Sequence, residues 1–385
     1  MNLPETMCAA VLTGHGDVEK IQYRQDVPVP TPKRGEVLIQ VTATAKNNTD
    51  RKVREGLYVT SEASDATSFQ MSGEPTLTFP RIQGADVVGR VVAVGDGVSE
   101  SRIGERGLLD FNIYPDERRE INLTPDYYGH GADGGFAEYM VAPSDQFYRV
   151  DSPTLSDAQL ASLGMCSYQT GYHMLTSARV RAGEHILITG GSGGVGTALI
   201  QLCRLLGAIP HVISSPGKAE GLKALGAETV IDRTSVSDLP TAVKEQAGGA
   251  HIDAVMDLAG GDLILPLFEV LTDRMSERND YPRLSIAGAS AGNITRLLWT
   301  TVYLYQIQIF GVSHGTRAEA DQLIRWIRDG ALKPVLHGTF PLSEIHEAER
   351  YFAGERRADF LGKLVLVPDS QWTEHGASFA VKGVA

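Results

Sequence analysis

A glycine-rich hexapeptide, Gly191-Ser-Gly-Gly-Val-Gly196, constrains the fold of this 385-residue chain more than any other segment. It follows a short apolar run, residues 185–189, and opens a stretch in which apolar side chains recur at a helical period. In such a turn the first glycine permits the bend, the second admits a pyrophosphate, and the third allows close packing of helix on strand. The motif therefore predicts a dinucleotide site, with the positive helix end facing the anion. Its binding residues are expected to be Gly191, Ser192, Gly193, Gly194 and Val195.

Apolar runs and helical stretches alternate through the following 120 residues, and Ser215-Pro216 has the pattern of a helix start. This alternation predicts an α/β fold, a doubly wound parallel sheet with helices on both faces. The expected strands are 185–189, 211–213, 229–232, 253–258, 283–287 and 306–310.

The first 150 residues have a different texture, with β-branched or alternating runs at 36–43, 85–95 and 135–142. Glycine and proline separate these runs, so we expect a β-rich first unit. Residues after Asp369 are polar and without pattern, which predicts a weakly ordered tail.

Composition excludes several classes of protein. The 47 acidic residues outnumber the 35 basic ones, giving a net charge of −12, so no nucleic-acid partner is expected. The three cysteines lack CxxC spacing, which favours a reducing, cytoplasmic setting. No apolar run approaches the ~20 residues that span a bilayer. The first residues lack the pattern of a signal peptide, so we expect a soluble, unprocessed chain with no membrane partner.

The end of the second expected strand bears on the choice of cofactor. A site selective for NAD usually has an acidic residue about 20 positions after the glycine motif. Here the chain reads Ile213-Ser-Ser-Pro-Gly-Lys218 instead. Ser214, Ser215 and Lys218 can receive a 2′-phosphate, and Arg233 offers a second cation, so the sequence predicts NADPH. In the alternative interpretation, Ser215 is a helix cap and Lys218 a surface charge.

The later strands end in small residues. Because ligands of such sheets bind beyond the carboxyl ends of the strands, these ends are expected near the adenine ribose and the nicotinamide. They are Ala259, Gly260, Gly288, Ala289, Phe310, Gly311 and Val312.

The order of these motifs, with Leu225-Gly-Ala-Glu-Thr-Val-Ile-Asp232 and a C-terminal Gly362-Lys-Leu-Val-Leu366, resembles the medium-chain dehydrogenase/reductase superfamily. The resemblance covers nearly the whole chain. It implies a GroES-like catalytic domain made of 1–152 and 334–385, and a Rossmann NADP(H)-binding domain at 153–333. It also implies an active site in the cleft, a homodimer formed through the last Rossmann strands, and cofactor contacts from Thr170 and Lys363.

The zinc-dependent alcohol dehydrogenase branch of that superfamily is a poor match. The resemblance places its first cysteine ligand at Asn47 and its histidine ligand at Ile82, and only Cys166 keeps a ligand type. One thiol cannot hold a tetrahedral zinc, and residues 108–132 contain no cysteine for a structural zinc, so no metal is expected.

The segment Asn47-Asn-Thr-Asp50 followed by Gly56-Leu-Tyr58 resembles the quinone oxidoreductase and enoyl-thioester reductase branches. The resemblance implies that Tyr58 is a catalytic proton donor and that Asn47 lies near the nicotinamide ribose. Tyr58 could equally just line the cleft, and Asp50 is expected to be structural.

We therefore expect a zinc-independent, NADPH-dependent reductase of an enone, an enoyl thioester or a quinone, acting on a small-molecule substrate. Two alternatives stay open: an alcohol dehydrogenase, and a cofactor-binding protein without turnover. Insertions at 59–78 and 111–131 are expected to shape the substrate pocket. Aromatic and apolar residues that could line it are Tyr114, Tyr127, Tyr128, Leu297, Trp299 and Tyr303.

Overall fold

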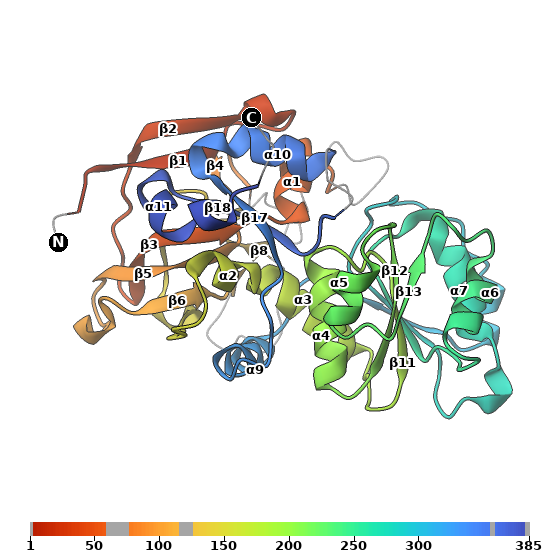
Figure 1. Ribbon diagram of the computed structural model, residues 1–385. Helices are drawn as coiled ribbons and strands as arrows, with labels where there is room; N and C mark the ends of the chain where they lie inside the picture. Colours follow the sequence, from red (N-terminus) through yellow and green to blue (C-terminus); the bar gives the residue numbers. More distant parts are fainter. Residues whose placement is uncertain (1–2, 59–76, 115–125, 355–358, 382–385) are drawn as a thin grey trace.

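The computed structural model describes residues 3–58, 77–114, 126–354 and 359–381, and within them two large sheets lie side by side (Figure 1). One is a six-stranded sheet and the other a seven-stranded sheet. Two smaller sheets flank the second: β2 (Ile21–Pro28), β1 (Thr6–Leu12) and β4 (Arg81–Ile82), and the pair β7 (Asn112–Ile113) and β8 (Asp126–Tyr127).

The six-stranded sheet is parallel throughout and doubly wound. Its order is β13 (Thr229–Asp232), β12 (Ile209–Ser214), β11 (His185–Ile188), β14 (Ala254–Asp257), β15 (Arg283–Ile286) and β16 (Gln308–Gly311). The order reverses between β11 and β14, where such sheets bind ligands. Figure 1 shows α4 (Gly194–Leu205) and α5 (Ala219–Ala224) on one face and α6 (Leu239–Gln246) and α7 (Ile264–Thr272) on the other. The predicted α/β fold class is confirmed.

The seven-stranded sheet joins segments from both ends of the chain. Its order is β10 (Phe147–Arg149), β6 (Arg106–Leu109), β5 (Asp86–Val94), β3 (Glu36–Ala45), β18 (Lys363–Val367) and β17 (Leu336–Pro341), and β9 (Tyr139–Pro143) also pairs with β3. Every residue of β18 is buried, because apolar neighbours cover both of its faces. Its pairing with β3 brings Lys363 close to the residues that follow β3.

A short helix, α1 (Asn48–Glu55), follows β3, and two predicted site residues, Asn47 and Tyr58, flank it. Asn47 is its N-cap, and the backbone N–H of Asn47 donates to Asp50 Oδ2 at 2.7 Å, which completes a capping box. Gly56 ends the helix with φ at 68°, a left-handed conformation that suits glycine.

The remaining helices complete the layers. They are α2 (Asp157–Ser162), α3 (Met165–Ser177), α8 (Trp299–Leu304), α9 (Arg317–Arg328), α10 (Ile345–Ala353) and α11 (Trp372–His375). A search of the described residues finds no helix long and apolar enough to cross a membrane.

Two local predictions were wrong. Ser215-Pro216 does not start a helix, because Gly217 has φ at 80° and continues a turn, and α5 begins only at Ala219. The described residues after Asp369, 370–381, are not a loose tail: they include α11, and Thr339 donates a 2.6 Å hydrogen bond to the carbonyl of Gly376. Long-range contacts with β17, which local polarity does not reveal, hold this segment.

Candidate active site

The glycine-rich turn between β11 and α4 is shaped by packing at two of its positions. A Cβ on Gly191 would lie 2.0 Å from Val212 Cγ1, and one on Gly196 would lie 2.5 Å from the carbonyl oxygen of Gly190. A Cβ on Gly193 would meet nothing closer than 3.8 Å. Among the described residues no side chain caps α4, which leaves its first N–H groups available to an anion. This cradle fits the pyrophosphate of a dinucleotide.

The residues expected to select the cofactor lie around the same turn. Lys218 Nζ is 3.3 Å from Ser192 Oγ, and the backbone N–H of Arg233 donates to the carbonyl of Ser214 at 3.0 Å. The Ser214 hydroxyl is buried and has no hydrogen-bond partner among the described residues. Ser215 follows it, partly exposed. Lys218 thus lies beside Ser192 of the turn, and Arg233 is joined to Ser214 through the backbone; the roles of all four in binding the cofactor stay predictions.

A buried polar cluster lies beside the first turn of α4. Lys363 Nζ donates to Asn47 Oδ1, to Asp86 Oδ2 at 3.0 Å and to Ser167 Oγ at 3.2 Å. Asn47 Nδ2 donates to the same Asp86 oxygen at 2.9 Å. A Cβ on Gly194 would lie 2.6 Å from Lys363 Cδ. The cluster therefore connects the seven-stranded sheet to the cofactor cradle.

This cluster does not fit a zinc ion. Its centre holds the ammonium group of Lys363, which would repel a second cation. Burial raises the pKa of the Cys166 thiol well above its ordinary value, which disfavours the thiolate that binds zinc. Within the described residues, no three His, Cys, Asp or Glu side chains are grouped so as to hold a metal.

The correspondence of Ile82 with a zinc-ligand position stays a prediction from the resemblance. Ile82 lies in β4 and pairs with Val11 in a different sheet. Asp86, four residues later, belongs to the polar cluster and accepts from Asn47 and, at 2.8 Å, from the backbone N–H of Cys166.

Three hydroxyl groups meet at Thr49, two residues after Asn47 of this cluster. Tyr58 Oη donates to Thr49 Oγ1 at 2.7 Å, and Thr49 Oγ1 lies 2.6 Å from Tyr127 Oη. Burial raises the pKa of both phenols, so both stay protonated at neutral pH. The neighbouring Asp50 is fully buried, and burial raises its pKa to about 6. Its carboxylate caps α1, in agreement with the structural role expected for it.

The ends of the later strands lie at the same edge of the six-stranded sheet as the glycine-rich turn. Ala259 accepts from Ala291 N at 2.7 Å, and a Cβ on Gly288, the residue before Ala289, would lie 2.4 Å from the carbonyl oxygen of Leu258. Phe310 and Gly311 are the last two residues of β16, and Val312 follows the strand. Thr170 Oγ1 donates to the carbonyls of Cys166 and Ser313, which ties α3 to the segment after β16.

Sequence reasoning missed several residues of this region. Asp86, Ser167 and His314 had no local signal, and Thr49 lay unremarked inside the segment from Asn47 to Asp50. Of the residues expected to line a pocket, Tyr127 lies in the site. The side chains of Trp299 and Tyr303 are 67% and 63% exposed, so these two residues do not line an enclosed pocket. Most of both insertions, residues 59–76 and 115–125, lies outside the described residues.

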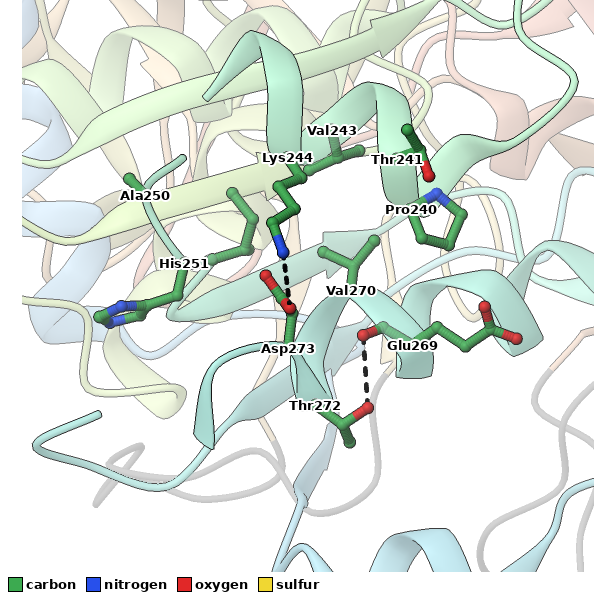
Figure 2. Close-up of a pocket in the computed structure, with 11 residues that line it drawn as sticks. Pro240, Thr241, Val243, Lys244, Ala250, His251, Glu269, Val270, Thr272 and Asp273 are labelled. Carbon is green, nitrogen blue, oxygen red and sulfur yellow. Dashed lines mark hydrogen bonds and ion pairs between the residues drawn. The ribbon is translucent and has the colours of Figure 1, made fainter. Parts of the chain in front are cut away.

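A hollow between α6 and α7 lies elsewhere (Figure 2). Figure 2 shows Lys244 pointing toward Asp273, and these side chains form an ion pair at 3.2 Å. His251 and Ile252, which precede β14, also line it. The hollow is therefore at the amino ends of the strands, opposite the glycine-rich turn, and contains no predicted site residue.

Two family models match the chain. The alcohol dehydrogenase GroES-like domain matches residues 33–152, and the zinc-binding dehydrogenase model matches residues 194–329. Human quinone oxidoreductase is 29% identical over 362 residues, covering 91% of this chain and 95% of the relative. The 2-methylene-furan-3-one reductase of Solanum lycopersicum is 32% identical over 374 residues, covering 96% and 81%. A solved structure from Sinorhizobium meliloti 1021, provisionally assigned as an alcohol dehydrogenase, has a TM-score of 0.89 and 46% identity, covering 95% and 98%.

Proposed function

This chain belongs to the medium-chain dehydrogenase/reductase superfamily of oxidoreductases, and from that premise we propose a specific reaction for it. The protein is a zinc-independent, NADPH-dependent reductase of an activated double bond, as in an enone or enoyl thioester, or of a quinone. The observation that carries the proposal is the pair of polar groups beside the cofactor cradle. A lysine ammonium lies at the centre of the buried polar cluster, and hydroxyl groups meet at Thr49, two residues after Asn47.

The chemistry follows from what these groups can do. The dihydronicotinamide, when bound, supplies a hydride to the β-carbon of the substrate. Negative charge then develops on the carbonyl oxygen, and the α-carbon needs a proton. A protonated phenol such as that of Tyr58 can donate to the oxyanion or deliver the proton. Asn47, held by Lys363 and Asp86, presents a fixed polar side chain beside the cradle.

The proposal of NADPH rests on Lys218 and on the absence of an acidic residue from the turn of residues 214–218, which follows β12. We expect Lys218→Ala to raise the KM for NADPH about tenfold or more, because a 2′-phosphate loses a charged hydrogen bond. The KM for NADH should hardly change. Lys223→Ala is the matched control, because it removes an exposed lysine from α5, the helix that follows Lys218. A wild-type preference for NADH would contradict the assignment.

A screen of NADPH consumption tests the reaction class. We expect the wild-type protein to oxidise NADPH with at least one of an enone, a quinone and an enoyl-CoA, without added metal. Activity restricted to an alcohol or simple ketone would favour the alcohol dehydrogenase alternative, which the Sinorhizobium meliloti structure supports. Tight NADPH binding with no turnover on any acceptor would favour a non-catalytic role.

We also propose the division into a catalytic domain, 1–152 with 334–385, and a cofactor domain, 153–333, and a homodimer in the cytoplasm. Support for the dimer comes from β16, an edge strand of its sheet, and from exposed apolar side chains next to it. The three cysteines are unpaired, which agrees with a reducing compartment.

A further inference from the structure

Tyr127 lies outside the segment from Asn47 to Tyr58 that carries the family resemblance, yet other rings enclose its side chain. It ends the short strand β8, its side chain is 2% exposed, and three rings surround it. Its ring centroid lies 6.0 Å from Phe111, 5.3 Å from His130 in a stacked arrangement, and 5.6 Å from His314 in an edge contact. The phenol oxygen therefore has a fixed position, 2.6 Å from Thr49 Oγ1.

His314 is the one ring of the three around Tyr127 that comes from the side of the six-stranded sheet. It follows β16 of the six-stranded sheet, whereas Phe111, His130 and Tyr127 come from the side of the seven-stranded sheet. Burial lowers the pKa of His314 to about 4, so the imidazole is neutral at pH 7. It packs against Tyr127 without placing a charge beside the phenol.

The hydroxyl group of Thr49 links the two phenols. A threonine hydroxyl has one proton to donate and two lone pairs to accept. It accepts from Tyr58 and shares its second hydrogen bond with Tyr127. The Tyr127 bond therefore orients the Thr49 hydroxyl, and the position of the Thr49 oxygen in turn orients the Tyr58 hydroxyl.

The hydrogen bond between Thr49 and Tyr58 matters because the groups around it disfavour the phenolate. Asp50 and Cys166 both face the two phenols, and both disfavour negative charge there. The hydrogen bond between Tyr58 and Thr49 has the opposite effect on the pKa of Tyr58, because the Thr49 hydroxyl can donate to the phenolate once it forms. A second phenol behind Thr49 strengthens that bond, because successive hydrogen bonds polarise one another.

We propose that Tyr127 is a positioning residue that acts through Thr49, holding the Tyr58 hydroxyl in place and stabilising the phenolate that Tyr58 becomes after donating its proton. The inference rests on the proposed function, in which Tyr58 is the proton donor.

A bound NADPH would supply a hydride to the β-carbon of the enone and leave as NADP⁺, and the electron pair of the double bond would then form an enolate. The O–H bond of Tyr58 breaks, a C–H bond forms at the α-carbon, and a phenolate remains. The Thr49 proton then turns toward the phenolate and the Tyr127 proton toward Thr49. When the product leaves, water reprotonates Tyr58, which is partly exposed.

A double-mutant cycle tests the proposal. We expect Tyr58→Phe to lower kcat about a hundredfold, within the usual range for loss of a general acid. We expect Tyr127→Phe to lower kcat about tenfold, with the KM for the enone changed less than about twofold. Because Tyr127 acts only through Tyr58, the double variant should be no slower than Tyr58→Phe alone. A kcat for Tyr127→Phe equal to wild type, or a fully multiplicative double variant, would overturn the proposal.

Variants of the link and a control separate positioning from folding. Thr49→Ser keeps the hydroxyl and should lose less kcat than Thr49→Val, which should lose at least as much as Tyr127→Phe. Tyr148→Phe removes a phenol bonded to Asp321 outside the site and should leave kcat unchanged. NADPH affinity, measured by fluorescence titration, and the unfolding midpoint should be unchanged in Tyr127→Phe. A loss of both would make the residue merely structural and refute the proposal.

The two claims fail in different ways. A wild-type protein that turns over no acceptor refutes the proposed function, and this inference with it. An active wild type whose Tyr127→Phe variant is equally fast refutes this inference alone.

Discussion

Tyr58 lies where the neutral phenol is favoured over the phenolate. Burial raises its pKa above the ordinary value of about 10, and Asp50 and Cys166 add to this effect, while the bond to Thr49 opposes it. A donor must hold its proton, so a raised pKa extends its working range to higher pH.

We therefore predict that kcat/KM for an enone stays level from about pH 7 to about pH 10, since Tyr58 remains protonated throughout. The measurement is initial rates of NADPH oxidation across this range, with the unfolding midpoint as a control. A fall in kcat/KM centred near about pH 8 would show that a group with a lower pKa donates the proton.

The site residues differ in how far sequence could predict them. Asn47, Tyr58 and Lys363 were expected only from the family resemblance, and the structure brings Asn47 and Lys363 into hydrogen-bond contact although 316 positions separate them. Asp86 and Tyr127 were not predicted in their observed places. Their importance comes from contacts with Lys363 and Thr49, which depend on the folded arrangement of distant segments.

Elements were predictable where their causes are local. The strand, turn and helix around residues 185–205 follow from an apolar run, a glycine motif and a helical period in one continuous stretch. The start of α5 was not predictable, because the left-handed conformation of Gly217 decides it. The order of the segment after Asp369 was not predictable either, because it depends on contact with β17.

Two glycines of the turn should respond differently to the same substitution. Gly196→Ala should cost about 2 kcal/mol or more of folding free energy, because its Cβ would strike the backbone of Gly190 and Gly191. Gly193→Ala should fold with an unchanged midpoint, since its φ of −79° suits alanine and the space is open. It should nevertheless weaken NADPH binding about tenfold, because the methyl group would occupy the pyrophosphate position.

Thermal unfolding and fluorescence titration with NADPH measure the two effects. Unchanged NADPH affinity in Gly193→Ala would mean that the cofactor phosphates do not approach this turn.

The molecule combines two large sheets, and the periodicity of the sequence predicts one of them better than the other. The parallel sheet was predictable from alternating strands and helices. The contribution of β17 and β18 to the other sheet was expected only from family resemblance, because pairing between β3 and a strand more than 300 residues later has no local pattern.

At this scale we predict a dimer through the edge strand β16 and helix α8. Leu298, Trp299 and Leu304 are 71%, 67% and 68% exposed, which is costly for apolar side chains unless a second copy covers them. Light scattering should give twice the chain mass of 41.5 kDa for the wild type and the single mass for Trp299→Glu. Ile103→Glu, at an exposed apolar residue far from α8 in the sequence, should stay dimeric. A monomeric wild type at micromolar concentration would contradict the prediction.

The most direct test of the central claim follows the hydride itself. NADPH carrying two deuterium atoms at C4 of the nicotinamide is incubated with the protein and an enone, and the product is examined by NMR. Reduction of the double bond predicts deuterium on the β-carbon, hydrogen from solvent on the α-carbon and an intact carbonyl group. Deuterium on the former carbonyl carbon, in an allylic alcohol, would show that the protein reduces carbonyl groups and would contradict the account.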